Sequence, residues 1–186
     1  MLPRALVTFG LSLVLGLAAP AAAEPGSGGS SRKLLTEGDR AAIARDFDTA
    51  LTKYRSILAD DPRNALVHYR VGQVLAMRGN SHEAEQAYIA ALGFSGTDDA
   101  LRGRILFCIA DLRERQRSYD AAADAWTEYE KQGVTAPAAT PQVAVGAERK
   151  NRIAEWKRAV AVAAETKARV ARRVQALDDL ARQSPK

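Results

Sequence analysis

A short pattern occurs three times in the central part of this sequence of 186 residues. In each copy an alanine is followed four residues later by a ring, and another packing residue follows three residues after the ring. Separations of three and four residues return side chains to the same face of an α-helix, so each copy predicts one helix. The three sets are Ala50, Tyr54 and Ile57; Ala84, Tyr88 and Ala91; and Ala122, Trp126 and Tyr129.

Another helical segment precedes each copy, and a turn-forming cluster joins the two. These earlier segments span residues 34–44, 65–77 and 104–115, and each carries a small residue at the matching position: Gly38, Gly72 and Ala110. A glycine inside a helix costs up to about 1 kcal/mol relative to alanine, so we expect close approach of the partner helix as compensation. The sequence therefore predicts three helix–turn–helix hairpins, each too small to bury its own apolar face.

The arrangement resembles the tetratricopeptide repeat family. The small residues of the first helices match, as do the alanines and rings of the second helices, and Pro62 stands where the family closes a repeat. The separation from Ala50 to Ala84 is 34 residues, which is the family period. The separation from Ala84 to Ala122 is 38 residues, which places about four extra residues in the loop at 93–99.

The sequence also departs from the family pattern. His68 and Leu106 stand where the family favours tryptophan, and the second and third repeats lack the closing proline. The resemblance covers residues 34–133 and implies an all-α solenoid of three hairpins, with a repeat domain at 33–133. The alternative is an unrelated alanine-rich helical bundle in which the three copies of the pattern are in phase by chance. An all-β sandwich is excluded, because an aromatic content of 6% is too low for one.

Proteins of this family bind peptides or partner proteins on a concave surface lined mainly by the first helix of each hairpin. By that resemblance, the partner-binding candidates are Leu66, Tyr69, Arg70 and Gln73 in the second repeat and Arg104, Phe107 and Asp111 in the third. Tyr69 and Phe107 could be anchoring rings, and Arg104 could pair with a carboxylate. The alternative is that these are ordinary surface residues. The lysines and asparagines of the family's clamp for C-terminal carboxylates are not found, so the ligand is not predicted.

The first 23 residues have the order of a secretory signal peptide. Residues 1–4 carry one positive charge, residues 5–19 are apolar and uncharged, and three alanines at 21–23 offer a cleavage site. A helix of 15 residues reaches about 22 Å, short of the roughly 30 Å hydrocarbon core. The sequence therefore predicts cleavage near Ala23 and export to the periplasm or medium. The alternatives are a buried helix and an uncleaved anchor. Residues 24–32 are predicted to be a flexible linker.

A Pro/Ala-rich loop is predicted at 134–146, followed by a long basic helix at 147–186. Its apolar residues alternate by three and four, which is the spacing of a coiled-coil seam. The helix could cap the third hairpin, which the dilute seam favours, or form a homo-oligomer through residues 147–183. The seam consists of Ile153, Trp156, Val160, Ala163, Lys167, Val170, Val174, Leu177 and Ala181.

Charge is unevenly distributed along the chain. Residues 24–146 carry 15 basic and 17 acidic side chains, a net charge of −2, whereas residues 147–186 carry 11 basic and 5 acidic, a net charge of +6. In an exported protein this favours a weak contact with an anionic envelope surface over nucleic-acid binding. The alternative is a solvated basic face.

Few residues of this sequence could carry chemistry. The two histidines, His68 and His82, have no Cys, Ser or carboxylate at the spacing of a triad or metal site, and the one cysteine, Cys108, is predicted to be an apolar core residue. His68 is predicted to be a packed or groove residue, and His82 to be exposed near a helix start. The acidic pairs at 60–61 and 98–99 flank helix ends, where turn or dipole roles explain them.

These observations combine into one functional prediction. The protein is expected to be a non-enzymatic adaptor of a bacterial-type cell envelope, with no cofactor and no metal, that binds a peptide or partner protein in its concave groove. Two alternatives stay open: a structural oligomer assembled through the C-terminal helix, and a regulatory subunit of an envelope enzyme.

Overall fold

The computed structural model describes residues 27–139 and 143–183, which form seven α-helices, one short 3₁₀ segment and no strand. The predicted signal peptide at 1–23 lies outside the described residues. The elements are α1 (Ser27–Ile43), α2 (Phe47–Asp60), α3 (Ala65–Arg78), α4 (Ser81–Phe94), α5 (Asp99–Arg115), α6 (Tyr119–Thr135), η1 (Pro137–Ala139) and α7 (Val143–Gln183). None of these helices is both long enough and apolar enough to cross a membrane.

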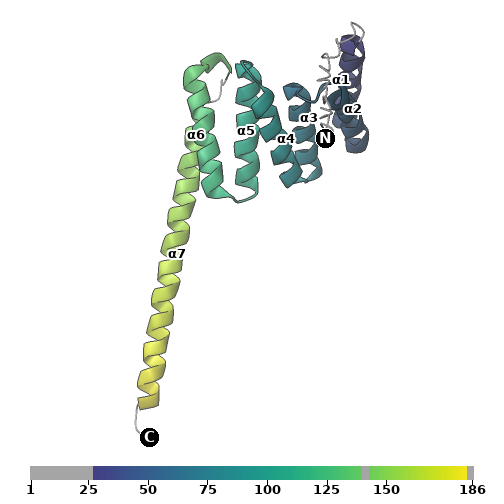
Figure 1. Cartoon of the computed structure of the whole chain (residues 1–186). Helices are drawn as coiled ribbons and strands as arrows, with labels where there is room; N and C mark the ends of the chain where they lie inside the picture. Colours follow the sequence, from purple (N-terminus) through teal and green to yellow (C-terminus); the bar gives the residue numbers. More distant parts are fainter. Residues whose placement is uncertain (1–26, 140–142, 184–186) are drawn as a thin grey trace, which may run out of the picture.

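The first six helices form three hairpins that stack in chain order: α1 with α2, α3 with α4, and α5 with α6 (Figure 1). Each helix packs against the next along the chain, and the first helices of neighbouring hairpins also touch, α1 with α3 and α3 with α5. This confirms the all-α solenoid of three hairpins predicted from the repeated pattern.

The repeated residues form the core of each hairpin. All three alanines of the second helices, Ala50, Ala84 and Ala122, are completely buried, and the rings of Tyr54 and Trp126 are buried beside them. The prediction for the glycines is also confirmed, because each one lies directly under a ring. A Cβ atom added to Gly38 would lie 2.6 Å from the ring of Tyr54, and one added to Gly72 would lie 2.6 Å from the ring of Tyr88.

Polar side chains at the helix starts define where the hairpins turn. The carboxylate of Asp46 accepts a hydrogen bond from the backbone N–H of Thr49, and that of Asp98 accepts one from Leu101 at 2.9 Å. Such caps satisfy N–H groups that have no partner within the helix. The predicted helix-end role of residue 98 is thus confirmed. The extra residues of the third repeat do not lengthen the loop at 93–99, because α4 and α5 are joined by four residues, as are α2 and α3. They add a turn to the start of α5, which has 17 residues where α3 has 14.

The element bounds differ from the sequence-based ones in three places. Helix α1 begins at Ser27, inside the predicted flexible linker, because extending an existing helix adds a hydrogen bond per residue without a new nucleation cost. Helix α5 begins at Asp99 instead of 104, because the Asp98 cap and the buried Leu101 fix an earlier start. The loop predicted at 134–146 is shorter, since α6 continues to Thr135 and α7 begins at Val143.

Helix α7 has two parts. Residues 143–157, here called the root, pack along α6, and Ile153 of the root is buried. Glu114 on α5 joins the root to the third hairpin, because it accepts hydrogen bonds from Arg149 at 3.0 Å and from the indole N–H of Trp126 at 3.2 Å. Residues 158–183, here called the arm, are all exposed and extend beyond the hairpins (Figure 1). The root thus covers the end of the solenoid, and the arm does not.

Candidate functional site

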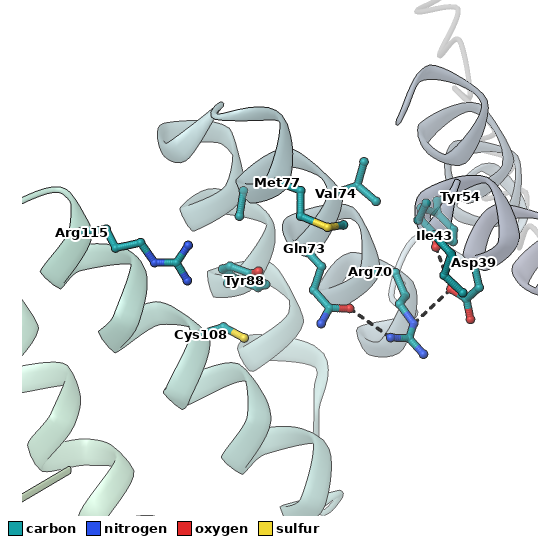
Figure 2. Close-up of a pocket in the computed structure, with 12 residues that line it drawn as sticks. Asp39, Ile43, Tyr54, Arg70, Gln73, Val74, Met77, Tyr88, Cys108 and Arg115 are labelled. Carbon is teal, nitrogen blue, oxygen red and sulfur yellow. Dashed lines mark hydrogen bonds and ion pairs between the residues drawn. The ribbon is translucent and has the colours of Figure 1, made fainter. Parts of the chain in front are cut away.

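A pocket of about 440 Å³ opens on the face formed by the first helices of the hairpins, α1, α3 and α5 (Figure 2). Tyr54 and Tyr88 belong to the second helices, and their rings reach the pocket from behind. All three hairpins therefore contribute to one concavity. Its lining residues are Asp39, Ala42, Ile43, Tyr54, Arg70, Gln73, Val74, Ala76, Met77, Tyr88, Cys108 and Arg115.

A chain of polar contacts forms the wall between α1 and α3 (Figure 2). The Tyr54 hydroxyl donates to Asp39 Oδ1 at 2.7 Å, and Arg70 Nε lies 3.2 Å from the same oxygen. Arg70 Nη1 donates to Gln73 Oε1 at 3.0 Å, and Gln73 Nε2 donates to the Tyr69 hydroxyl at 2.9 Å. Burial, with the hydrogen bond to Asp39, holds the pKa of Tyr54 far above its usual range. The phenol is therefore a neutral donor that fixes the Asp39 carboxylate.

Arg70 keeps unused hydrogen-bonding capacity within this wall. Its Nε is shielded from solvent and has no hydrogen-bond partner, because its approach to Asp39 has the distance of an ion pair without the geometry of a hydrogen bond. A buried N–H without a hydrogen-bond partner costs about 1–3 kcal/mol, and the Asp39 carboxylate at 3.2 Å offsets part of that cost here. The Arg70 side chain as a whole is 34% exposed, so a ligand in the pocket can contact it.

The wall on α5 is made by Cys108 and Arg115. Burial raises the pKa of the Cys108 thiol, although hydrogen bonding with the hydroxyls of Tyr69 and Tyr88 opposes this. The thiol is therefore protonated at neutral pH and acts as a small neutral surface. Arg115 forms an ion pair with Asp111, one helical turn earlier, and that contact raises the pKa of the guanidinium. Cys108 was predicted to be a core residue, but it is half-buried and faces the pocket.

Apolar side chains form the mouth of the pocket. Ile43 is 84% exposed and Met77 is 56% exposed, whereas Val74 is buried between them and the core. Large exposed apolar side chains beside charged groups are a common feature of protein-binding surfaces. The pocket thus combines an apolar mouth with polar walls that are already ordered.

The structure separates the predicted groove residues into two sets. Arg70 and Gln73 line the pocket, and Asp111 holds its Arg115 wall. Tyr69 lies behind Gln73 and is only 5% exposed, so its ring belongs to the core and is not an exposed anchor. Its ring centre lies 6.0 Å from that of Tyr88.

The other predicted groove residues lie away from the pocket. Phe107 packs its ring against Trp126 and Tyr129, with ring centres 5.3 and 5.7 Å apart, and is half-buried. Arg104 is exposed, and its Nε donates to the carbonyl oxygen of Ala100 on its own helix. Leu66 is half-buried against the core. Their part in binding stays a prediction.

Ten of the twelve lining residues were not among the predicted groove residues, although the repeat itself carried the signal for several of them. Counted from the small residue of each first helix, the residue one position later is Asp39, Gln73 or Asp111, and the residue five positions later is Ile43, Met77 or Arg115. Two positions earlier stand Arg70 and Cys108 in the second and third repeats. The pocket is therefore built from equivalent positions of successive repeats.

The histidines have structural contacts. His68 Nε2 lies 2.9 Å from the carbonyl oxygen of Pro62, and its ring packs 5.4 Å from that of Phe94. His82 is exposed on the first turn of α4 and contacts Gln86 through Nε2. In the part of the chain that the structure describes, no three His, Cys, Asp or Glu side chains are grouped so that they could hold a metal ion.

Comparisons with known proteins agree with this geometry. No family model matches the chain, and no curated protein matches it. Among solved structures, the TPR2B domain of yeast Sti1, in a complex with pHsp70, superposes with a TM-score of 0.59 at 12% identity, covering 68% of this chain and 98% of that one.

Two further domains superpose in the same way. The TPR domain of Arabidopsis OM64 has a TM-score of 0.54 at 15% identity, covering 67% of this chain and 94% of that one. The Sgt2 TPR domain from Aspergillus fumigatus has a TM-score of 0.50 at 16% identity, covering 66% and 82%. Together with the three stacked hairpins and their matching alanines, glycines and rings, these likenesses show that the chain has the tetratricopeptide-repeat fold.

Proposed function

We propose that the protein is a non-enzymatic adaptor that binds an extended segment of a partner protein along the face formed by α1, α3 and α5. The observation that carries the proposal is the pocket of about 440 Å³ to which all three hairpins contribute. An apolar side chain of the partner enters between Ile43, Val74 and Met77, and desolvation of these side chains supplies the main driving force.

Arg70 supplies the polar part of recognition. Its guanidinium is held by Asp39 and Gln73, so few rotamers are lost when a ligand binds, and preordering of this kind improves affinity. A carbonyl or carboxylate oxygen of the partner accepts a hydrogen bond from this guanidinium. Since Asp39 offsets the charge of Arg70 and Asp111 offsets that of Arg115, the walls favour a segment with little net charge.

Similar folds support this proposal, because the TPR2B domain of yeast Sti1 was solved in a complex with pHsp70. The partner of the present chain is expected to be different, since the lysines and asparagines of the family's clamp for C-terminal carboxylates are not found in this sequence. If residues 1–23 direct export, that partner belongs to the cell envelope.

Cleavage of residues 1–23 can be tested by purifying the protein from the cells that make it. An N-terminus at Glu24 in the mass spectrum is the expected result.

The binding proposal can be tested without knowing the partner. A library of displayed random peptides is selected on the chain from Glu24 onward, and the affinities of the selected peptides are measured by calorimetry. Arg70→Ala and Met77→Lys are expected to weaken binding at least about tenfold, which corresponds to about 1.4 kcal/mol. Ile89→Lys is the matched control, because Ile89 is an exposed apolar residue on α4 that does not line the pocket.

Two outcomes would count against the groove. Peptides that bind the two pocket variants as tightly as the control would place the site elsewhere. The second outcome is that no peptide is selected and that Met77→Lys does not change which proteins are captured from envelope fractions. That result would favour a structural role over recognition by the pocket.

A further inference from the structure

The seam of α7 is covered along the root and exposed along the arm. Ile153 is buried against the third hairpin, and the ring of Trp156 lies 4.2 Å from that of Tyr119, the first residue of α6. Because α6 begins at Tyr119, it cannot accompany α7 further. The same seam then continues along about 39 Å of exposed helix, from Arg158 to Gln183 (Figure 1).

An apolar stripe runs along the arm, with residues separated by three and four positions. Its large members are between 46% and 60% exposed. A spacing of 3.5 residues stays in line only when helices wind around each other in a left-handed coiled coil. The arm stripe consists of Val160, Ala163, Lys167, Val170, Val174 and Leu177.

We propose that two copies of the chain pair through their arms as an antiparallel, two-stranded coiled coil. In this register Val160 of one copy packs on Leu177 of the second copy, and Lys167 packs beside Val170 of the second copy. A single lysine at a first seam position, here Lys167, specifies register and oligomer state at a cost in stability. The inference is independent of the groove, which lies on the hairpins.

Charge decides the orientation. In an antiparallel pair, the acidic Asp178 and Asp179 near the end of one arm lie beside the basic Arg158 at the start of the other. In a parallel pair in register, Lys167 would face Lys167 of the second copy, and like charges at a seam destabilise. A parallel pair would also bring both sets of hairpins to the same end, where α6 already covers the seam.

The test measures association of the chain from Glu24 onward by sedimentation equilibrium from low micromolar to several hundred micromolar protein. The mass is expected to rise toward twice the monomer value. Val170→Glu is expected to raise the dissociation constant at least tenfold. Val162→Glu is the matched control, because Val162 is a valine of the arm that is 63% exposed and lies off the stripe. A monomeric mass throughout, or equal effects of the two variants, would overturn the pairing.

Disulfide trapping tests the orientation. Val160→Cys and Leu177→Cys are made separately in a Cys108→Ala background and oxidised alone and as a mixture. The antiparallel register predicts efficient cross-linking only in the mixture, since Cα atoms must lie about 4.4–6.8 Å apart. Efficient cross-linking of each variant alone would overturn the orientation. Binding of a monomeric chain to phosphatidylglycerol vesicles that is lost in Val170→Glu would assign the stripe to lipid and overturn the proposal.

Discussion

Replacement of Gly72 by alanine tests whether helix packing or helix propensity governs this fold. In an isolated helix the change stabilises by about 1 kcal/mol. In this structure the new methyl carbon would lie 2.6 Å from Cδ1 and Cε1 of Tyr88, about 1 Å closer than ordinary carbon contacts. Tyr88 is buried and packs on Tyr69, so its ring cannot turn aside.

The net effect follows from these two opposing terms. Overpacking a core typically costs about 1–3 kcal/mol, and a rigid buried ring places Gly72→Ala at the upper end of that range. Subtraction of the propensity gain leaves about 2 kcal/mol of destabilisation. For a chain of this length, that corresponds to a melting temperature about 4–8 °C lower.

Urea and thermal unfolding followed by circular dichroism measure the change, and Gly93→Ala is the matched control. Gly93 is also helical, in α4, but a Cβ there would have no neighbour within 4 Å, so a gain of up to about 1 kcal/mol is expected. In a Tyr88→Leu background the cost of Gly72→Ala should shrink. If Gly72→Ala stabilises as much as Gly93→Ala, the close-approach explanation of the glycine is refuted.

Three further outcomes follow from the structure. Trp126→Ala removes a fully buried indole and should cost about 3–5 kcal/mol in urea unfolding; a loss below 1 kcal/mol would contradict its place in the core. Truncation after Lys157 should leave the melting temperature of the hairpins unchanged, whereas truncation after Gly146 should lower it, and equal effects would show that the root does not cap. Burial raises the pKa of Tyr69 to about 12. Its contribution to stability is therefore complete below pH 10 and is lost as the pH rises toward 12, and the tyrosinate absorbance difference from Tyr69→Phe should have its midpoint near pH 12 rather than 10.

The solenoid could be predicted from the sequence because its determinants are local and repeated. The spacing from Ala50 to Tyr54 recurs in each hairpin, and Gly38 and Gly72 predicted close helix contacts that the structure shows. Helix starts were less predictable. At Asp99 the start depends on a single cap that precedes it and on burial of Leu101, which only the packed third hairpin supplies.

The site was only partly predictable because a concave surface depends on how successive repeats superpose. Arg70 and Gln73 were identified, yet Asp39 was missed, since its importance comes from the hydroxyl of Tyr54 and the guanidinium of Arg70 on other helices. The same limit explains Tyr69. An aromatic residue on the first helix is a plausible anchor for a ligand when only the sequence is known. In the structure, the packing of α3 on α4 turns the Tyr69 ring inward against Tyr88.

Contacts between helices in this protein run mainly between neighbours along the chain, and this bears on its synthesis. Chains emerge from the ribosome N-terminus first. The first hairpin, α1 and α2, can therefore pack against the second hairpin while the rest of the chain is still being made. The third hairpin has to wait for residues 143–157, which cover the face containing Tyr119 and Trp126. A chain that stalls before Lys157 would therefore expose the apolar face of the third hairpin to chaperones and proteases. Synthesis of the root of α7 covers that face and ends this exposure.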